Sequence, residues 1–210
     1  LPHLAWIIEN IAFHTGWPVQ VFCSHDNAHI IRGLDFPVEH IITSEIALHN
    51  YTWALVDEKF WSMLPETVLV FQTDAFLLRD GIDEFTEYDY IGAPWAWAYA
   101  SDDRALFRSA GNGGLSLRKN SKMLEIIRTL PYQQVCSDPC FGLDAGTGPP
   151  EDLYFAYGLD RLGGHLPPLE AKMRFCVETL FHPAPLAVHG IDRHFDDDKI
   201  RQILFPHPDP

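Results

Sequence analysis

The chain has 210 residues, of which 47% are hydrophobic and 21% are charged, so it can bury a sizeable core and is not of the disordered class. The formal net charge is −14 and no basic stripe is present, which argues against a nucleic-acid-binding protein. No apolar run reaches about 18 residues, so we expect no membrane span in this chain.

The first third of the chain predicts alternating helices and strands. Apolar residues recur at helical spacing over residues 4–14, and Gly16 is expected to end that helix. Strands are predicted over residues 19–23 and 38–43. A helix is expected to begin over residues 28–32, and a long helix or a pair of helices is expected over residues 44–64.

The remaining segments continue this alternation. Residues 68–71 are all apolar, as is typical of a strand in the middle of a sheet. Further strands are predicted over 89–95, 115–118, 171–177 and 186–189, and helices over 151–162 and from a cap at Asn120 or Ser121 to about residue 129. Residues 96–110 and 131–149 are expected to form loops, and the tail after residue 205 is expected to be loose. The pattern predicts one α/β domain, a sheet flanked by helices.

Asp74 directly follows the apolar strand at residues 68–71, in the segment Gln72-Thr73-Asp74. A buried lone carboxylate costs several kcal/mol unless it is paired or bound to a metal. In open α/β sheets, ligands bind beyond the carboxyl ends of the strands. Asp74 is therefore either a cap for the next segment or a ligand-binding carboxylate, and its position alone favours the cap.

The segment GNGGLSLR, which begins at Gly111, has three glycines in four residues. Glycine permits close approach of the backbone to a ligand, and Asn112 and Arg118 add polar groups. A hairpin turn is an equally good interpretation.

The helix predicted at residue 151 begins with Glu151 and Asp152. The helix macrodipole favours carboxylates in the first turn, which is a sufficient reason for both. An acidic pair beside a glycine-rich loop could also act as a general base that deprotonates a hydroxyl group.

The C-terminal region contains His182, His189 and His194, and His189 follows a short apolar strand as Asp74 does. A lone histidine is usually structural or exposed, whereas a histidine with a carboxylate partner is a possible metal site. Cys136 and Cys140 lack the spacing of a zinc pair, so the four cysteines are interpreted as free thiols or at most one disulfide. These cysteines, and the lack of a visible signal peptide, favour a cytoplasmic location.

The ordered segments FQTD, YDYIGAPW, GNGGLSLR, PEDLYFAY and PLAVHG resemble a glycosyltransferase-like domain family of unknown function. The sequence looks like a GT-A glycosyltransferase, a Rossmann-like fold that uses nucleotide-sugar donors. The resemblance covers roughly residues 4–195. It implies a single GT-A domain over residues 1–205, with a mixed sheet flanked by helices and without its first strand, followed by a loose tail at 206–210.

The resemblance also implies roles for individual residues. Asp74 takes the last position of an Asp-x-Asp metal motif whose first Asp is replaced by Gln72, and His189 would be a second ligand to Mn²⁺ or Mg²⁺. Asp152 would be the base of an inverting enzyme, with Glu151 as the alternative. The substrate-binding positions implied are Gly111, Asn112, Gly113, Gly114, Trp95 and Arg118, with Tyr90 as a core or pocket residue and Asp26 and Asn27 as candidates for binding the nucleotide base.

The predicted function is transfer of a sugar from a nucleotide-sugar donor to a glycan or another hydroxyl acceptor. One alternative is a non-catalytic GT-A-like domain that binds a glycan or a partner, which the incomplete metal motif favours. A second alternative is a metal-dependent hydrolase or nucleotidyltransferase, which would require more carboxylates or a more basic phosphate loop.

Overall fold

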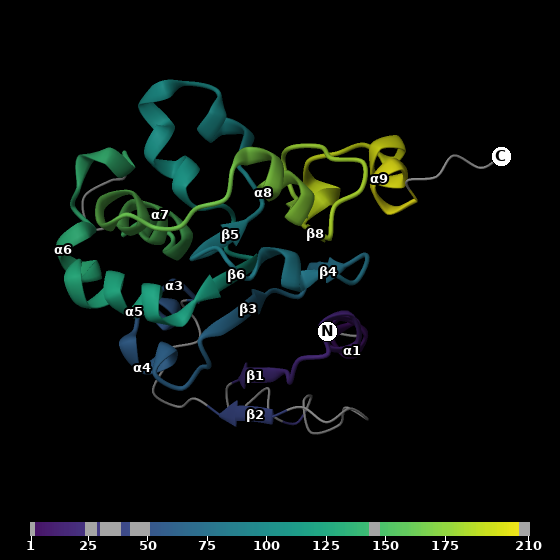
Figure 1. The fold of residues 1–210 in the computed structure, drawn as a ribbon, viewed down its shortest axis with the longest axis horizontal. Helices are drawn as coiled ribbons and strands as arrows, with labels where there is room; N and C mark the ends of the chain where they lie inside the picture. Colours follow the sequence, from purple (N-terminus) through teal and green to yellow (C-terminus); the bar gives the residue numbers. More distant parts are fainter. Residues whose placement is uncertain (1–2, 24–28, 30–38, 43–50, 143–147, 206–210) are drawn as a thin grey trace.

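The computed structural model describes residues 3–23, 29, 39–42, 51–142 and 148–205 (Figure 1). In these residues the strands form three small sheets. One sheet pairs β1 (Gln20–Cys23) with β2 (Glu39–Ile42) in parallel, and the second has the antiparallel order β3 (Thr67–Phe71), β6 (Leu115–Lys119), β5 (Tyr90–Gly92). The third has the mixed order β4 (Ala75–Leu77), β8 (Ala187–His189), β7 (Cys176–Val177).

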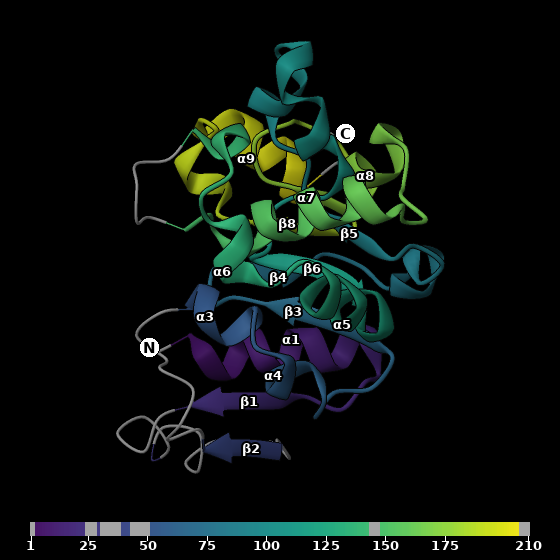
Figure 2. The same cartoon turned by 90° about the vertical axis from the view of Figure 1, so that its left-hand side faces the viewer.

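Helices cover these sheets and confirm the predicted α/β class. The α-helices are α1 (Leu4–Thr15), α3 (Tyr51–Leu55), α4 (Glu58–Trp61), α5 (Asn120–Thr129), α6 (Tyr132–Val135), α7 (Glu151–Leu162), α8 (Leu169–Phe175) and α9 (Asp197–Leu204). The 3₁₀ helices are η1 (Ile82–Phe85), η2 (Ala96–Tyr99), η3 (Asp102–Ser109), η4 (Pro139–Phe141) and η5 (Ile191–Arg193). Figure 2 shows α5 in front of β3 and β6, with α7 above β6 and α1 farther back, below β3. The α7 helix packs against α5 and η3.

Strand β6 separates two hydrophobic clusters because its side chains alternate between the two faces of the sheet. Leu115 and Leu117 pack into one cluster together with Ile91 and Phe175. The intervening Ser116 and Arg118 are also fully buried. Arg118 lies against the aromatic rings of the other cluster, which contains Trp61, Tyr90 and Phe155. The sheet therefore carries polar side chains into the α7 side of the core.

The helix at the start of the chain forms as predicted. Ile7, Ile8 and Ile11 of α1 are buried, which is the stripe that helical periodicity requires. Gly16 ends the helix in the left-handed conformation, with φ of 67°, and its N–H donates to Ala12 O. Glycine is favoured at such a position because it has no Cβ.

The prediction that residues 68–71 lie in the middle of a sheet is wrong for the described part of the chain. Strand β3 pairs only with β6 there and is an edge strand. Its other side borders a cavity of about 530 Å³, whose opposite wall includes β1 and α1. All five residues of β3 are half-buried, which is consistent with this position.

Two further predictions are corrected by the structure. Residues 96–110 are not simply a loop, because they include η2 and η3, which pack against each other and bury Ala98 and Phe107. Residues 171–177 are not a strand throughout, because α8 runs to Phe175 and only the last two residues are extended. Good helix formers, including Leu169, Ala171 and Lys172, favour the helix.

The other predicted elements are confirmed within the described residues. Residues 51–64 hold the pair α3 and α4. The prediction of a loop at 131–149 is wrong in part, because its described residues include α6 and η4. All four cysteines are free. The predicted helix start at 28–32, except His29, and the tail at 206–210 lie outside the described residues. No helix in the described ranges has the length and apolar character needed to cross a membrane.

Candidate functional site

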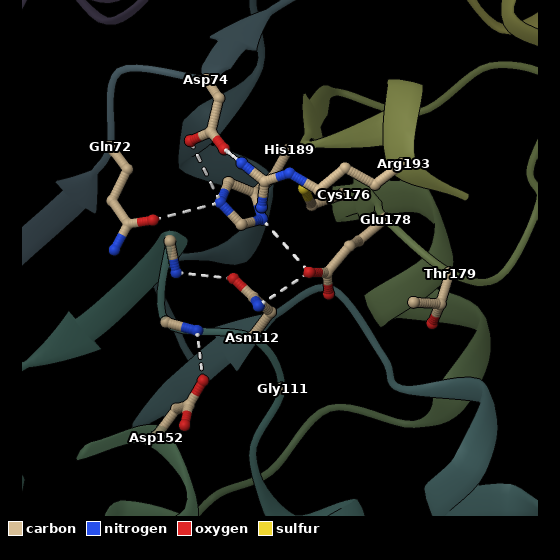
Figure 3. Close-up of polar contacts among 12 residues, drawn as sticks. Gln72, Asp74, Gly111, Asn112, Asp152, Cys176, Glu178, Thr179, His189 and Arg193 are labelled. Carbon is tan, nitrogen blue, oxygen red and sulfur yellow. Dashed lines mark hydrogen bonds and ion pairs between the residues drawn. The ribbon is translucent and has the colours of Figure 1, made fainter. Parts of the chain in front are cut away.

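The candidate site lies where the chain passes from the β3 sheet to the β4 sheet through Gln72, Thr73 and Asp74 (Figure 3). The N–H of Gln72 donates to Gly114 O at 2.7 Å, and the N–H of Gly190 donates to Asp74 O at 3.1 Å. These bonds join the turn to the glycine-rich loop before β6 and to the chain after β8. Three segments that are far apart in sequence are thereby held together.

Asp74 and His189 lie side by side because Ala75 pairs with His189 in the β4–β8 ladder. His189 Nε2 is 3.3 Å from Asp74 Oδ1 and 3.3 Å from Gln72 Oε1. The second carboxylate oxygen of Asp74 pairs with Arg193 of η5. The histidine side chain is only 4% exposed, whereas that of Asp74 is 29% exposed. The pair therefore joins a buried imidazole to a carboxylate that solvent can reach.

Glu178 lies on the opposite side of the same imidazole ring. Its Oε1 is 3.4 Å from His189 Nδ1 and accepts a hydrogen bond of 2.8 Å from Asn112 Nδ2. Asn112 Oδ1 in turn accepts from the N–H of Gly114 at 2.6 Å. Sequence reasoning missed Glu178. The available signal was its position directly after an apolar segment, which is the position that drew attention to Asp74.

Three glycines of this loop pack so closely against neighbouring groups that a side chain would not fit. A Cβ on Gly111 would overlap the backbone of Gly92, one on Gly113 would overlap the Glu151 carboxylate, and one on Gly114 would overlap the His189 ring. The loop is further held by Tyr90, whose hydroxyl donates to Gly111 O at 3.0 Å. Close packing therefore explains the three glycines.

Glu151 and Arg118 form a buried ion pair and do not face the open side of the site. Arg118 Nη1 and Nη2 donate to the two carboxylate oxygens at 3.0 and 3.1 Å, and the two side chains are 0% and 3% exposed. Burial alone would lower the pKa of Arg118, but Glu151 and the nearby phenols outweigh it and raise that pKa. The structure therefore argues against the expected roles of Arg118 in substrate binding and of Glu151 as a base. Both side chains are buried, and they make their hydrogen bonds with each other.

Asp152 behaves differently from its neighbour. It is half-buried, and its Oδ2 accepts a hydrogen bond of 3.1 Å from the N–H of Gly113. Burial, followed by the charge of Glu151, raises the pKa of Asp152 to about 7, and the bond from Gly113 and the charge of Arg118 offset only part of this. A carboxyl group with a pKa near neutrality can accept a proton effectively, because the best catalytic pKa lies near the working pH.

Trp95 is almost completely buried, as is Tyr90. The Trp95 ring stacks on Trp97, with 5.3 Å between centroids and 22° between planes. Thr179 fixes this turn, since its hydroxyl donates to Pro94 O at 3.1 Å and accepts from the Ala96 N–H at 2.9 Å. Trp95 therefore supports Trp97 from behind and does not itself present a surface to a ligand.

The atoms around His189 Nε2 have the spacing of ligands to a divalent cation. Neighbouring ligands of an octahedral Mg²⁺ ion lie about 2.9 Å apart, close to the 3.3 Å separations of Nε2 from Asp74 and Gln72. A carboxylate on the other ring nitrogen is typical of metal-binding histidines, and Glu178 occupies that position. No group of three His, Cys, Asp or Glu side chains suited to a metal occurs in the described residues, so a cation would need further oxygen ligands.

The structure therefore brings together most of the residues that the sequence singled out. Asp74, His189, Asn112, Gly113 and Gly114 join one network with Asp152. The other two histidines of the C-terminal cluster lie outside this network: His182 approaches Glu170 at 3.9 Å, and His194 belongs to the turn after η5. Asp26 and Asn27 lie outside the described residues.

Comparison with known proteins assigns the chain to a family. No curated protein and no solved structure matched it. The family model described as "Protein of unknown function (DUF5672)" matches residues 36–189, a range that includes the turn at Asp74, the glycine-rich loop, Asp152 and His189. The chain belongs to the DUF5672 family.

Proposed function

We propose that the protein is a metal-assisted glycosyltransferase that transfers a sugar from a nucleotide-sugar donor to a hydroxyl acceptor with inversion. The single observation that carries this proposal is the continuous network from Asp74 through His189, Glu178 and Asn112 to the glycine-rich loop and Asp152. It places a candidate cation site and a candidate base on two sides of the same short loop. These are the two parts that displacement of a diphosphate by a hydroxyl group requires.

Asp152 is the proposed base. Its carboxylate takes the proton of the acceptor hydroxyl while that oxygen attacks the anomeric carbon of the donor. The bond from the anomeric carbon to the diphosphate oxygen breaks in the same step, and the electron pair leaves with the diphosphate. Attack on the face opposite the leaving group inverts the configuration. The Gly113 N–H holds the carboxylate in position.

His189, Asp74 and the amide oxygen of Gln72 are the proposed ligands for Mn²⁺ or Mg²⁺. A bound cation would neutralise the charge that develops on the leaving diphosphate. Diphosphate oxygens and water would complete the coordination shell, as is common for Mg²⁺ with few protein ligands. Glu178 would orient His189 and keep Nε2 directed toward the cation.

The cavity between β1 and β3 is the proposed location of the nucleotide. Its lining includes Gln72 and Thr73, so it opens next to the candidate cation site. Tyr51 also lines this cavity. We further propose that the three sheets and their helices are a GT-A-like domain, on the basis of the chain order of the five segments that carry the resemblance.

The test is a thermal-shift screen of nucleoside diphosphates and nucleotide sugars with Mn²⁺, with Mg²⁺ and with EDTA. A ligand that binds only the folded protein raises the melting temperature. We expect a shift with one nucleotide sugar that EDTA abolishes. Absence of any shift for the whole panel would reject the transferase proposal.

A non-catalytic binding domain is the second candidate, and one observation favours it. Arg193 already pairs with the Asp74 carboxylate, and the pair places a positive charge where a cation would bind. If Arg193 stays there with donor present, the domain would bind its ligand without metal. In the screen, this function would appear as a shift that EDTA leaves unchanged.

A further inference from the structure

The described structure contains a second cavity, of about 360 Å³, apart from the one beside the candidate cation site. It lies between η3, η4 and the start of α7, and Leu153, the residue after Asp152, forms part of its wall. Helix α7 packs directly against η3. None of the catalytic, metal-binding or substrate-binding residues predicted from the sequence lines this cavity. Its volume lies within the range of small-molecule sites, about 300 to 1,000 Å³.

Aromatic rings form the main wall of this cavity. Trp97 contacts Phe107 edge to face at 5.3 Å, and Phe107 lies 6.3 Å from Phe141 of η4. Trp95 stacks behind Trp97, so the indole is braced in one orientation. The weakly positive C–H groups of a sugar ring can stack on the negative face of such an aromatic ring. A braced ring loses little conformational freedom when a ligand binds.

Charged side chains complete the lining. Asp103 and Arg104 stand at the rim and are exposed, and the Arg104 guanidinium lies 5.6 Å from the Trp97 ring centroid. A carboxylate accepts hydrogen bonds from sugar hydroxyls, and a guanidinium donates to them. The cavity thus offers an apolar platform with both kinds of hydrogen-bonding partner, which suits a neutral polyhydroxyl ligand.

We propose that this cavity, walled by Trp97, Phe107, Phe141 and Leu153, is the subsite for a sugar acceptor. The assignment rests on the proposed transferase function and gives the acceptor its chemical class, a glycan. The nucleotide is placed in the other cavity, because that cavity opens at Gln72 and Thr73 beside the candidate cation ligands. Asp152, the proposed base, directly precedes Leu153 of this cavity wall in the chain.

The test uses three methyl glycosides as probes: methyl β-D-glucopyranoside, methyl β-D-galactopyranoside and methyl α-D-mannopyranoside. Saturation-transfer NMR measures their binding to the full chain without metal or nucleotide. We expect at least one to bind the parent protein, and the Trp97→Ala variant to bind it roughly threefold to tenfold more weakly, as loss of one aromatic contact predicts. The Trp97→Phe variant should retain most of the affinity.

Trp6→Ala is the matched control, because Trp6 is 52% exposed on α1 and is not part of the cavity lining. Circular dichroism and melting temperature show whether each variant is folded, and Arg104→Ala replaces Trp97→Ala if the latter unfolds. Equal glycoside binding by the parent and the Trp97→Ala variant would overturn the proposal, as would no binding of any probe to the parent.

The donor screen separates the two proposals. A metal-dependent donor shift without glycoside binding would leave the transferase function standing and remove this subsite. Glycoside binding that depends on Trp97, without any donor shift, would keep the cavity as a glycan site and remove the transferase function. A nucleoside diphosphate that displaces the glycoside, and that also requires Trp97, would show that the cavity binds the nucleotide and would overturn the assignment.

Discussion

The two adjacent glycines Gly113 and Gly114 separate two buried polar regions that differ in how completely their atoms are satisfied. Beside Gly113, Arg118 donates two hydrogen bonds of normal length to the Glu151 carboxylate, and its guanidinium lies among the rings of Tyr90, Trp61 and Phe155. We call this the closed pair. Beside Gly114, His189 has only neighbours at 3.3 to 3.4 Å, and we call this set, with Asp74 and Glu178, the open cluster.

The open cluster also contains atoms without a hydrogen bond. His189 Nδ1 and Glu178 Oε2 are buried and have no hydrogen-bond partner in the described part of the chain. Buried polar atoms are nearly always satisfied, so exceptions point to a ligand, water or ion. The closed pair shows that buried charges whose hydrogen bonds are all made can have a purely structural role. Buried charged groups that lack some of their hydrogen bonds, as in the open cluster, instead indicate a ligand-binding site.

The largest effect is expected for Asp152, which lies next to Glu151 of the closed pair but is not part of that ion pair. We expect Asp152→Asn to lower the transfer rate about 10²- to 10⁴-fold, the usual contribution of a general base, without changing the donor thermal shift. In the parent, the rate should rise as pH increases through about 7, because the deprotonated carboxylate is the active form. A fully active Asp152→Asn enzyme would exclude Asp152 as the base.

The closed pair predicts a large loss of stability when it is broken. We expect Arg118→Met to lower the free energy of unfolding by about 3–5 kcal/mol, because it leaves Glu151 buried without a partner. The double variant Arg118→Met with Glu151→Met should recover most of this loss. Urea unfolding measures both variants. If the double variant is no more stable than the single one, the loss arises from packing and not from the unpaired charge.

For the open cluster we expect substitutions to weaken ligand binding, whereas substitutions in the closed pair lower stability. We expect Asp74→Ala and His189→Ala each to weaken Mn²⁺-dependent donor binding by at least about tenfold, the scale found for groups that support a metal site. Arg193→Ala should strengthen it, because it frees the Asp74 carboxylate. Isothermal titration with Mn²⁺ measures these changes. Parent-like binding by both alanine variants would show that the cation does not bind here.

The two glycines provide a matched comparison between the regions. Gly113→Ala and Gly114→Ala should each cost about 1–3 kcal/mol of stability, because an added methyl overlaps Glu151 in one case and the His189 ring in the other. Only Gly114→Ala is expected to weaken metal-dependent donor binding as well. Equal effects of both substitutions on binding would contradict the separation of the closed pair from the open cluster.

The smallest effect concerns Lys172, a third buried charge, which donates to the carbonyl oxygens of Ala110 at 2.6 Å and of Arg108. Burial lowers the pKa of Lys172 from 10.5 to about 7. The unfolded chain therefore binds one more proton between these values, and stability should rise with pH from 7 to 9. The slope is at most about 1.4 kcal/mol per pH unit.

Lys172→Met should remove that slope, and urea unfolding at pH 7, 8 and 9 measures it. The exposed Lys59 of α4 provides the control, because Lys59→Met should leave the slope unchanged. A parent slope of zero would mean that the two carbonyl partners keep Lys172 charged in the folded protein.

Much of the fold could be predicted because local patterns decide it. The apolar stripe of α1, the alternation in β6 and the cap at Gly16 each require only a short window of sequence. The wrong predictions arose where local signals were ambiguous. The segment over residues 171–177 contains both helix and strand formers, and residues 96–110 lack a clear period, so neither window identified α8 or η3.

Only some residues of the candidate site could be predicted from the sequence. Asp74, His189 and Asp152 were found because each stands at the end of a strand or the start of a helix. Glu178 was missed although it directly follows the strand predicted at residues 171–177, because its partner Asn112 lies 66 residues away in the chain. Arg118 was predicted to bind the substrate because the alternating pattern of β6 does not reveal which of its polar side chains are buried in the core.

The sequence alone determined the class of fold, the main helices and strands, and the glycine-rich loop, because these depend on residues close together in the chain. Only the tertiary structure decided which polar groups meet. Arg118 and Glu151 are 33 residues apart, Asn112 and Glu178 are 66 apart, and Gln72 and His189 are 117 apart. Burial and pairing then set whether each charge is satisfied. Glu151 is enclosed in an ion pair, whereas the adjacent Asp152 is unpaired and half-buried, and its pKa is near neutrality.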